Sequence, residues 1–303
     1  MTRADGEVDL PAFLAAERDA VEVALTAALK GLTARVPHAF RDALAHGVTS
    51  GGKRLRPILC VAAYRAAGGQ DPRIYSLAVS LELIHAYSLM HDDLPCMDDA
   101  ALRRGEPTTH TVFGEEGTVV AGALLIPASA LQAWEGAHAM GLAEERGRTL
   151  VKELTRAAGG GGMVGGQVLD LLGEDRKLTS RELDELHRRK TGALLRASLR
   201  MGAIAAEAGE REIRALDRYG EAIGLAFQIA DDILDATSTA KALGKNPSDV
   251  QLGKSTYVSL FGLEEASRTA QGLADDAVAF LREGRLEAPE LEALARYIVE
   301  RKK

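Results

Sequence analysis

Hydrophobic and polar positions alternate with helical spacing along most of the chain. Apolar residues that recur every three or four positions predict amphipathic helices over about residues 10–32, 37–46, 58–67 and 72–90. A longer periodic run extends from Ser180 to Glu207. The glycines of Gly159–Gly162 are typical of a hinge between two helices or of a loop that only connects them. Short alternating runs typical of strands are not needed to explain the pattern. The chain is therefore predicted to be all-α.

The composition agrees with a helical core. Hydrophobic residues make up 46% of the 303 residues and aromatic residues only 4%, so the apolar mass is mostly Ala and Leu, which are strong helix formers. No proline occurs between Pro127 and Pro247, so long uninterrupted helices fit there. No Gly-, Ser- or Pro-rich linker divides the chain. We therefore expect a single domain over residues 1–303.

Charge and cysteine content exclude several classes of protein. The formal net charge of −7 argues against a nucleic-acid partner, which would require a basic face. Cys60 and Cys96 provide no disulfide framework and are expected to be reduced thiols of a cytoplasmic protein. The first residues lack the features of a signal peptide. The longest apolar stretch, Val119–Leu131, contains Pro127 and is too short to span a bilayer, so no stable membrane association is expected.

Two clusters of aspartates follow apolar helical segments. The first lies at the end of the helix predicted over residues 72–90 and comprises Asp92, Asp93, Asp98 and Asp99. The second comprises Asp231, Asp232 and Asp235. Neighbouring like charges repel by roughly 1 kcal/mol in water and by more near a protein surface, and carboxylates at a helix C-terminus oppose the helix dipole. Either cluster alone is compatible with a solvated surface, but two such clusters favour a shared cation site.

The spacing within each cluster determines how its carboxylates can reach a cation. Asp92 and Asp98 are six residues apart and cannot share one face of a regular helix. Pro95 disfavours helix at Leu94 and can turn the chain so that both aspartates reach one ion. In the second cluster a single helix stripe carries polar residues at i, i+3 and i+7: Gln228, Asp231 and Asp235.

The chemistry of these side chains favours magnesium. Their oxygen atoms are the ligands that Mg²⁺ prefers, and Mg²⁺ commonly combines one or two carboxylates with substrate phosphates and water. His85 and His91 lie near the first cluster, but the sequence has no His/Cys spacing typical of a zinc site. These histidines are therefore interpreted as hydrogen-bond donors or core residues.

A basic loop precedes one of the predicted helices. Gly51 and Gly52 expose backbone N–H groups, and three cations, Lys53, Arg54 and Arg56, follow at the start of the helix. Together with the helix dipole, this arrangement predicts a phosphate-binding cradle. The alternative is a basic loop that is exposed to water without a ligand.

The chain resembles the trans-isoprenyl diphosphate synthases, which include farnesyl and geranylgeranyl diphosphate synthases. The matching segments occur in the order of the family: Gly51–Pro57, Ile84–Pro95, Leu102–Gly105, Met163–Gln167, Lys190–Gly192, Phe227–Asp235, Leu243–Lys245 and Leu252–Tyr257. Each segment alone is a weak signal, but the ordered set is specific. The resemblance implies the isoprenoid synthase fold, a bundle of long helices around a central substrate cavity, and a homodimer.

The resemblance also implies a reaction and its metal ions. Enzymes of this family join an allylic diphosphate, such as dimethylallyl or geranyl diphosphate, head to tail to isopentenyl diphosphate and release pyrophosphate. Three Mg²⁺ ions are implied, held by Asp92 and Asp98 on one side and by Asp231 on the other. Asp93 and Asp235 would then lie beside the ions without being direct ligands.

Residues for both substrates follow from the same resemblance. The allylic diphosphate would be bound by Arg103, Lys190 and Lys245. Isopentenyl diphosphate would be bound by Gly52, Lys53, Arg56, His85 and Arg104, and Lys254 would also be a substrate-binding residue. The side-chain oxygens of Thr191 and Gln228 would stabilise an allylic cation. Without the resemblance, Lys190 would be interpreted as a solvated helix residue.

Product length is expected to depend on Tyr87. Tyr87 and Ser88 precede Asp92 by five and four residues, which places them roughly 6–8 Å below the carboxylates along a helix. Ser88 is too small to close a tunnel there, whereas the ring of Tyr87 can reach across it. An aromatic residue at this position resembles bacterial farnesyl synthases, so a fifteen-carbon product is expected, with twenty carbons as the alternative. Tyr87 as an ordinary core residue is the other interpretation.

Four positions depart from the family pattern. Ala100 and Ala101 stand where further acidic residues are common, and Ala123 stands where an aspartate is usual. Pro127 follows and is expected to kink a helix that lines the tunnel. We therefore expect an altered tunnel wall and unchanged metal and phosphate ligands.

Two other functions agree less well with the sequence than prenyl transfer does. A class I terpene cyclase also ionises a prenyl diphosphate with magnesium, but it has no need for a second diphosphate site, so Gly51–Arg56 and the Arg103–Arg104 pair argue against it. A non-catalytic regulatory subunit is disfavoured because both aspartate motifs are intact.

Overall fold

The chain folds almost entirely into helices. The computed structural model describes residues 8–174, 176–237 and 255–300. The helices in the first half are α1 (Leu10–Thr33), α2 (His38–Thr49), α3 (Leu55–Ala66), α4 (Ile74–Asp92), α5 (Thr109–Ala139), α6 (Glu144–Ala158) and α7 (Met163–Gly173). Those in the second half are α8 (Ser180–His187), the π-helical turn η1 (Arg188–Gly192), α9 (Ala193–Ala205), α10 (Glu210–Thr237), α13 (Tyr257–Phe261), α14 (Leu263–Gly284) and α15 (Pro289–Glu300). The all-α prediction is confirmed.

The helix α4 lies at the centre of the first half of the fold. Every residue from Leu77 to Ile84 is buried, so this helix is covered on all sides. A helix that is apolar around its whole circumference must be surrounded by other elements, and α4 packs along α5 and against α1, α2 and α3. The acidic cluster at its C-terminal end is therefore carried on a rigid support.

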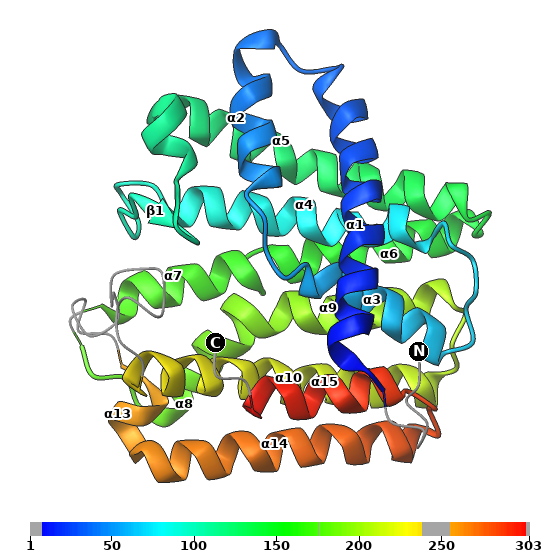
Figure 1. Ribbon diagram of the computed structural model, residues 1–303, viewed down its shortest axis with the longest axis vertical. Helices are drawn as coiled ribbons and strands as arrows, with labels where there is room; N and C mark the ends of the chain where they lie inside the picture. Colours follow the sequence, from blue (N-terminus) through cyan, green and yellow to red (C-terminus); the bar gives the residue numbers. More distant parts are fainter. Residues whose placement is uncertain (1–7, 175, 238–254, 301–303) are drawn as a thin grey trace.

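The second half of the fold is organised around α10. This helix packs along α14 and against α9 and α15. In Figure 1, α4 and α5 lie in the upper part of the molecule and α10 and α14 in the lower part, and α3 contacts α9 between them. Leu59, Leu199 and Leu216, one from each of α3, α9 and α10, share one buried apolar cluster. The contact between α3 and α9 therefore joins the supports of the two acidic clusters.

The predicted helices are present, with shifted ends. The helix predicted over 37–46 extends to Thr49, and the helix predicted to begin at Ile58 begins three residues earlier, at Leu55. The helix predicted over 72–90 begins at Ile74 and continues to Asp92. The run from Ser180 to Glu207 is interrupted by the π-helical turn η1, which helical periodicity did not predict.

The backbone of α5 breaks at a different residue from the expected one. Inside its range Gly114 has non-helical dihedral angles (φ 78°, ψ 163°), whereas Pro127 lies within continuous helix. A positive φ of this size is readily adopted only by glycine. Ala123 and Pro127 are both exposed, while Gly122 and Leu125 are buried. Ala123 and Pro127 therefore lie on the exposed face of α5, and the expected kink at Pro127 is wrong. Their effect on the tunnel wall stays a prediction.

A small β-hairpin interrupts the helical fold between α4 and α5. Its strands are β1 (Leu102–Arg103) and β2 (Glu106–Pro107), which pair antiparallel. Arg104 (φ 56°) and Gly105 (φ 84°) form its turn with positive φ values, as expected for a two-residue hairpin loop. The hairpin gives the neighbouring Arg103 and Arg104 different directions.

One described helix meets the length and composition of a membrane span. It is α5, with a mean hydropathy of 1.4 in the tested window. This is weak evidence, because core helices of globular proteins meet the same condition, and α5 packs along α4 and against α2 and α6.

Candidate active site

The first acidic cluster is formed by a tight turn after α4. Asp92 is the last residue of α4, and the backbone N–H of Asp98 donates to the carbonyl oxygen of Asp92 at 2.9 Å. Pro95 lies exposed within this turn. As the sequence predicted, the chain turns between the two aspartates, so that the charge of Asp98 acts on Asp92.

The environment of Asp92 disfavours the charged form of its carboxyl group. Burial raises the pKa of its carboxyl group to about 6; the nearby Lys190 ammonium lowers it, and the carboxylate of Asp98 raises it further. Burial disfavours the charged form of a carboxyl group, and a neighbouring negative charge does the same. A divalent ion beside Asp92 and Asp98 would offset both effects.

The neighbouring Asp93 has a different role. It is 4% exposed and is held by Arg103, whose Nε and Nη2 atoms lie 2.7–2.9 Å from its carboxylate oxygens. Bidentate arginine–carboxylate pairs of this kind fix the geometry of both side chains. Asp93 therefore anchors Arg103 of the hairpin to the end of α4, and Arg103 lies close enough to Asp92 to act on its charge.

The second acidic cluster is divided in the same way. Gln228, Asp231 and Asp235 are all partly buried on the predicted stripe of α10. Asp232 instead points into the protein, where its Oδ2 accepts from the backbone N–H of Tyr257 at 2.7 Å and lies 4.0 Å from Nε2 of His187. Asp232 thus attaches α10 to the start of α13 and to the end of α8.

Close glycine contacts align α10 and α7 with the turn η1. A Cβ atom on Gly224 would lie 3.0 Å from the Cα of Gly192, and one on Gly166 would lie 2.1 Å from the backbone nitrogen of Lys190. Gly224 is four residues before Gln228 and seven before Asp231, so these residues share one face of α10. The second acidic stripe therefore continues the face that contacts η1, which carries Lys190 and Thr191.

Sequence reasoning missed the partner of Lys190. Its Nζ lies 2.6 Å from Oδ2 of Asp170 on α7, and that carboxylate is largely buried. Asp170 is four residues after Gly166, so both lie on the side of α7 that faces η1. The i, i+4 spacing was visible in the sequence, but nothing in the sequence indicated that Lys190 lies opposite.

The side-chain oxygens near Asp92 fit a magnesium ion that is shared with phosphate and water better than they fit a metal site made of protein ligands alone. Within residues 8–174, 176–237 and 255–300, no group of three or more His, Cys, Asp or Glu side chains is close enough to hold a metal ion. The partly buried oxygens of Asp92, Asp98 and Asp231 fit an ion that completes its shell with phosphate oxygens and water, as Mg²⁺ does.

The structure brings four of the predicted isopentenyl-side residues together around α4: Gly52, Arg56, His85 and Arg104. The guanidinium of Arg104 contacts the carbonyl of Gly51, and a Cβ atom on Gly52 would lie 2.6 Å from Nη1 of Arg104. Burial, followed by the charges of Arg56 and Arg104, holds the pKa of His85 well below its usual range. His85 is therefore neutral near pH 7 and surrounded by cations.

Arg56 occupies the centre of this basic cluster. Burial lowers its pKa to about 10, Glu82 opposes that shift, and Arg104 adds to it. Its buried Nε has no hydrogen-bond partner among the described residues. Two cations this close to each other and to a neutral histidine form a site for an anion. His85 precedes Asp92 by seven residues, so the basic cluster lies about 10 Å along α4 from the acidic cluster.

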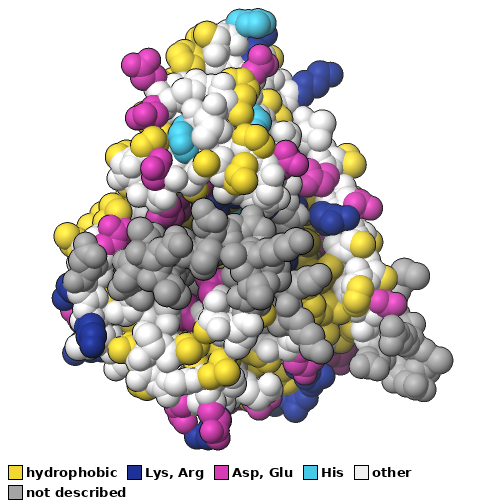
Figure 2. Space-filling view, turned by 60° about the vertical axis from the view of Figure 1, so that its left-hand side comes forward, with side chains coloured by type: hydrophobic (Ala, Val, Ile, Leu, Met, Phe, Trp, Pro, Cys, Tyr) yellow, Lys and Arg dark blue, Asp and Glu magenta, His cyan; other side chains and the backbone are white. Residues whose placement is uncertain are grey.

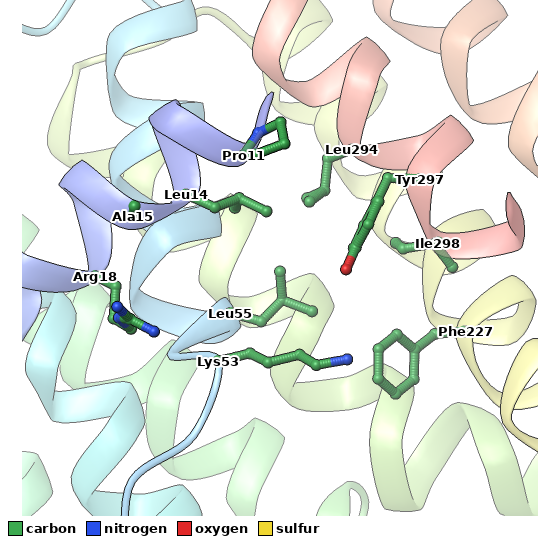
Figure 3. A pocket seen from close by; sticks show the side chains of 10 residues that line it. All are labelled: Pro11, Leu14, Ala15, Arg18, Lys53, Leu55, Phe227, Leu294, Tyr297 and Ile298. Atoms are coloured by element: carbon green, nitrogen blue, oxygen red, sulfur yellow. The ribbon is translucent and has the colours of Figure 1, made fainter. Parts of the chain in front are cut away.

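Lys53 points away from this cluster into a separate pocket. Its side chain extends toward the ring of Phe227, and the hydroxyl of Tyr297 points into the same space (Figure 3). The pocket has a volume of about 220 Å³, and apolar residues of α1, α3, α10 and α15 line most of it. Lys53 and Arg56 are therefore close along the chain, as predicted, but their side chains point into different sites.

The predicted chain-length residues lie on different sides of α4. The ring of Tyr87 packs edge-on against His91 with centroids 4.7 Å apart, and burial together with the charge of Asp92 raises the pKa of Tyr87. Ser88 instead donates to the carbonyl oxygen of His85 at 2.8 Å. A Cβ atom on Gly122 of α5 would lie 2.4 Å from Nε2 of His91. Tyr87 is therefore held near Asp92 at the contact of α4 with α5.

Two predicted substrate residues lie outside the described residues: Lys245 and Lys254. On the face shown in Figure 2, the Lys and Arg side chains of the described residues are scattered among Asp and Glu rather than gathered into one basic patch. The described residues on this face therefore show no extended basic surface of the kind typical of a nucleic-acid interface.

The chain is similar to known proteins over most of its length. Residues 37–287 match the family described as Polyprenyl synthetase. Farnesyl diphosphate synthase of Escherichia coli (strain K12) is 45% identical over 267 residues, covering 86% of this chain and 89% of that protein. Geranylgeranyl pyrophosphate synthase 12, chloroplastic, of Arabidopsis thaliana is 40% identical over 296 residues, covering 96% and 81%. The geranyltransferase of Helicobacter pylori, complexed with magnesium and isoprenyl diphosphate, superposes with a TM-score of 0.78 at 34% identity, covering 95% of this chain and 96% of that chain.

Proposed function

Because the chain belongs to the polyprenyl synthetase family and is a prenyltransferase of the trans-isoprenyl diphosphate synthase type, we propose that it makes mainly farnesyl diphosphate. It would condense dimethylallyl or geranyl diphosphate with isopentenyl diphosphate and release pyrophosphate. The observation that carries the proposal is the placement of two separate charged clusters along α4: Asp92 with Asp98, Arg103 and Lys190 at its end, and Arg56 with His85 and Arg104 about 10 Å before it.

The acidic cluster provides the allylic half of the site. We propose that Asp92, Asp98 and Asp231 hold Mg²⁺, with three ions in all and with Asp93 and Asp235 beside them. When bound, the ions supply positive charge that stabilises the departing pyrophosphate. Arg103 and Lys190 are fixed by Asp93 and Asp170, so their cations are oriented toward the same diphosphate before it binds. Lys245 would complete this set.

The basic cluster provides the other half of the site. Arg56, Arg104 and the backbone of Gly52 would bind isopentenyl diphosphate, with His85 donating as a neutral imidazole. Lys53 and Lys254 are also proposed to bind it; for Lys53 this requires its side chain to turn out of the pocket lined by Phe227. Thr191 and Gln228 offer neutral oxygens to an allylic cation, and the departing pyrophosphate accepts the proton, so no side-chain base is needed.

The size of the product is proposed to be fifteen carbons. Tyr87 supports this, because its ring lies close to Asp92 and is held against His91. The relatives include both farnesyl and geranylgeranyl synthases, so a twenty-carbon product is the second candidate.

The enzyme is further proposed to be a single-domain homodimer that uses the outer face of α5. This face carries the exposed apolar side chains Val119, Val120, Ile126 and Leu131. Exposed Ala123 and Pro127 extend it. An apolar face of this length fits a second copy of the chain, and the loss of the usual aspartate at Ala123 makes the face more apolar.

One assay tests the proposed reaction. Purified protein is incubated with isopentenyl diphosphate, Mg²⁺ and each allylic diphosphate in turn, and the mass of the product is measured. A fifteen-carbon diphosphate supports the proposal. A product of mainly twenty carbons would replace it with geranylgeranyl diphosphate synthesis. A cyclic hydrocarbon, or no elongation with any primer, would contradict prenyl transfer as its activity.

A further inference from the structure

A buried ion-pair network lies beside the basic cluster of Arg56, His85 and Arg104, and Glu82 of this network acts on the charges of Arg56 and Arg104. Its centre is Arg54, which is 4% exposed. Nε of Arg54 lies 2.7 Å from Oε1 of Glu22 on α1, and Nη1 lies 2.7 Å from Oε1 of Glu82 on α4. Nη2 donates to the carbonyl of Val48 in α2 at 3.2 Å. One guanidinium thus joins α1, α2 and α4 at the start of α3.

The backbone around Arg54 explains why such an anchor is needed. Gly51 (φ 74°), Gly52 (φ 136°) and Arg54 (φ 50°) all have positive φ values within four residues. Arginine adopts this left-handed conformation reluctantly, and it persists only where the surroundings hold it. The side-chain contacts of Arg54 provide that hold, and they set the direction in which α3 presents Arg56.

Glu82 also faces the cations that a diphosphate would meet. Its charge stabilises the protonated forms of Arg54, Arg56 and Arg104. Of these three, Arg54 forms a direct ion pair with Glu82. The buried Glu82 therefore offsets part of the repulsion among the arginines while Arg56 and Arg104 remain available to an anion.

We propose that Arg54 and Glu82 are positioning residues for the isopentenyl-diphosphate half of the site. They hold the glycine loop, Arg56 and Arg104 in the arrangement that a diphosphate needs, and they do not touch the substrate themselves. Arg54 is thereby assigned a role different from that of Lys53 and Arg56, which flank it in the same basic run. This inference rests on the proposed prenyl-transfer function. It adds that Arg54 and Glu82 affect the binding of isopentenyl diphosphate and not that of the allylic diphosphate.

The chain contains a matched control for this network. Glu17 on α1 is 6% exposed; its Oε1 lies 2.7 Å from Nη1 of Arg65 on α3, and it accepts from the hydroxyl of Tyr75 on α4 at 2.8 Å. It joins α1, α3 and α4, so it shares α1 and α4 with the network of Arg54 and Glu82. Arg65 lies nine residues after Arg56, about 14 Å further along α3, so this pair is remote from the glycine loop.

The test compares four variants of the full chain: Arg54→Lys, Glu82→Gln, Arg65→Lys and Glu17→Gln. KM is measured separately for isopentenyl diphosphate and for the allylic diphosphate, together with kcat and the melting temperature. Arg54→Lys and Glu82→Gln are expected to raise KM for isopentenyl diphosphate by about tenfold or more, the size seen when an outer partner of a ligand-binding group is lost. KM for the allylic diphosphate should change less than about threefold. A difference of this kind between the two KM values shows that the substitutions affect only the isopentenyl-diphosphate half of the site.

The control pair should lower the melting temperature without changing either KM. Arg56→Ala serves as a positive reference for the isopentenyl side and Lys190→Ala for the allylic side. Equal changes in both KM values for Arg54→Lys, or kinetics that match those of Arg65→Lys, would overturn the positioning role. If Arg54→Lys does not fold, Glu22→Gln replaces it, because Glu22 is the partly exposed partner of Arg54. Glu22→Gln should then raise KM for isopentenyl diphosphate alone, and equal changes in both KM values would overturn the positioning role.

A separate readout distinguishes failure of this inference from failure of the proposed function. Binding of inorganic pyrophosphate without Mg²⁺ is measured by calorimetry for the wild type, Arg54→Lys and Arg65→Lys. A wild type that elongates no primer contradicts the proposed function, while weaker pyrophosphate binding confined to Arg54→Lys still supports the inference. Unchanged binding in Arg54→Lys contradicts the inference even in an active enzyme.

Discussion

Neighbouring residues of the same type have different roles throughout the site. Asp92 faces Lys190 and Asp98, whereas the adjacent Asp93 is buried against Arg103. Asp231 lies on the polar stripe of α10, whereas Asp232 points inward to the backbone of Tyr257. In each doublet, one aspartate is held in a structural contact, and the other is the one proposed to bind Mg²⁺. The reason is geometric, because consecutive residues on a helix point about 100° apart.

This difference predicts that substitutions at the two aspartates of each doublet have different effects on kcat and on the melting temperature. Asp92→Ala and Asp231→Ala should each lower kcat by about a thousandfold or more. The metal ions stabilise the departing pyrophosphate by several kcal/mol, and each loss of about 1.4 kcal/mol lowers the rate tenfold. Both variants should remain folded by circular dichroism. Asp232→Asn is the control for Asp231→Ala and should mainly lower the melting temperature. Asp93→Asn should in addition raise KM for the allylic diphosphate, because it releases Arg103. Near wild-type turnover of Asp92→Ala at saturating Mg²⁺ would contradict a shared metal group.

The environment of His85 predicts an acid-dependent loss of stability. Burial lowers its pKa in the folded state, and the cations that face it lower the pKa further: Arg56, Arg104, Arg103 and Arg54. The unfolded state has a pKa near 6.5 and therefore binds more protons as the pH falls below that value. The free energy of unfolding should then fall with decreasing pH by up to about 1.4 kcal/mol per pH unit.

Chemical denaturation of the wild type and His85→Gln from pH 8 to pH 5 measures this effect. The variant should lose less stability than the wild type between pH 7 and pH 5. His138→Gln, which changes an exposed histidine at the end of α5, is the control and should follow the wild type. Parallel curves for the wild type and His85→Gln would rule out this source of acid sensitivity.

At the scale of elements, glycine contacts determine how the helices that carry the site approach one another. Gly166 lets α7 reach the backbone of η1, and Gly224 lets α10 reach Gly192. These contacts place Asp170 opposite Lys190 and align the stripe of α10 with Thr191. The π-helical turn at η1 occurs where these helices meet, which agrees with the frequent occurrence of such turns at functional sites.

Gly166→Ala tests the role of this close contact. The added Cβ atom would lie 2.1 Å from the backbone nitrogen of Lys190, so α7 must move away from η1. We expect kcat/KM for the allylic diphosphate to fall by about tenfold or more, since a displacement of about 1 Å can reduce a rate a hundredfold. Gly161→Ala is the control, because a Cβ atom there meets nothing within 4 Å. Equal activity of the two variants would exclude this contact as a determinant of the site.

The position of Tyr87 on α4 makes a prediction about product length. Tyr87→Ala would remove the ring that packs against His91 near Asp92 and should shift the products to twenty carbons or more. Product chain length is measured by mass spectrometry after incubation with excess isopentenyl diphosphate. Tyr75→Phe, at the start of the same helix, should leave product length unchanged. A Tyr87→Ala variant that still makes the wild-type product would assign Tyr87 to core packing instead.

At the scale of the whole molecule, the two halves of the site belong to different packing units. Asp92 lies on α4 among α1–α5, and Asp231 lies on α10, which packs along α14. The contact of α3 with α9 joins these units. The outer face of α5 lies outside this arrangement and remains apolar, with Val119, Ile126 and Leu131 each at least 42% exposed.

The proposed homodimer predicts that charges on this face separate the subunits. Val119→Lys and Ile126→Lys, alone and together, should convert a dimer into a monomer, because burying an unpaired lysine in an apolar contact is strongly unfavourable. Light scattering coupled to size exclusion measures the mass in solution. Val23→Lys, at a position on α1 that is 74% exposed, should leave the mass unchanged. A wild type that is monomeric, or a dimer that both variants preserve, would contradict an interface on α5.

The sequence alone determined the features that depend on local periodicity and residue type. The helical spacing predicted the all-α fold, the spacing of Asp92 and Asp98 around Pro95 predicted the turn after α4, and the ordered motifs predicted the family. These features could be predicted because the helix period and the restriction imposed by proline act within a few residues. Helix ends shifted by two or three residues, as at Leu55, because capping and packing decide where a helix begins.

Only the tertiary structure decided which member of each charged doublet faces the site. Asp170 opposite Lys190, Glu82 beneath Arg54, and the separate pocket that takes up the side chain of Lys53 all join residues that are distant in sequence. The exposure of Ala123 and Pro127 likewise depends on how α5 packs against α4. The physical reason is that burial and charge pairing are set by neighbouring elements, and neither propensity nor periodicity specifies which elements those will be.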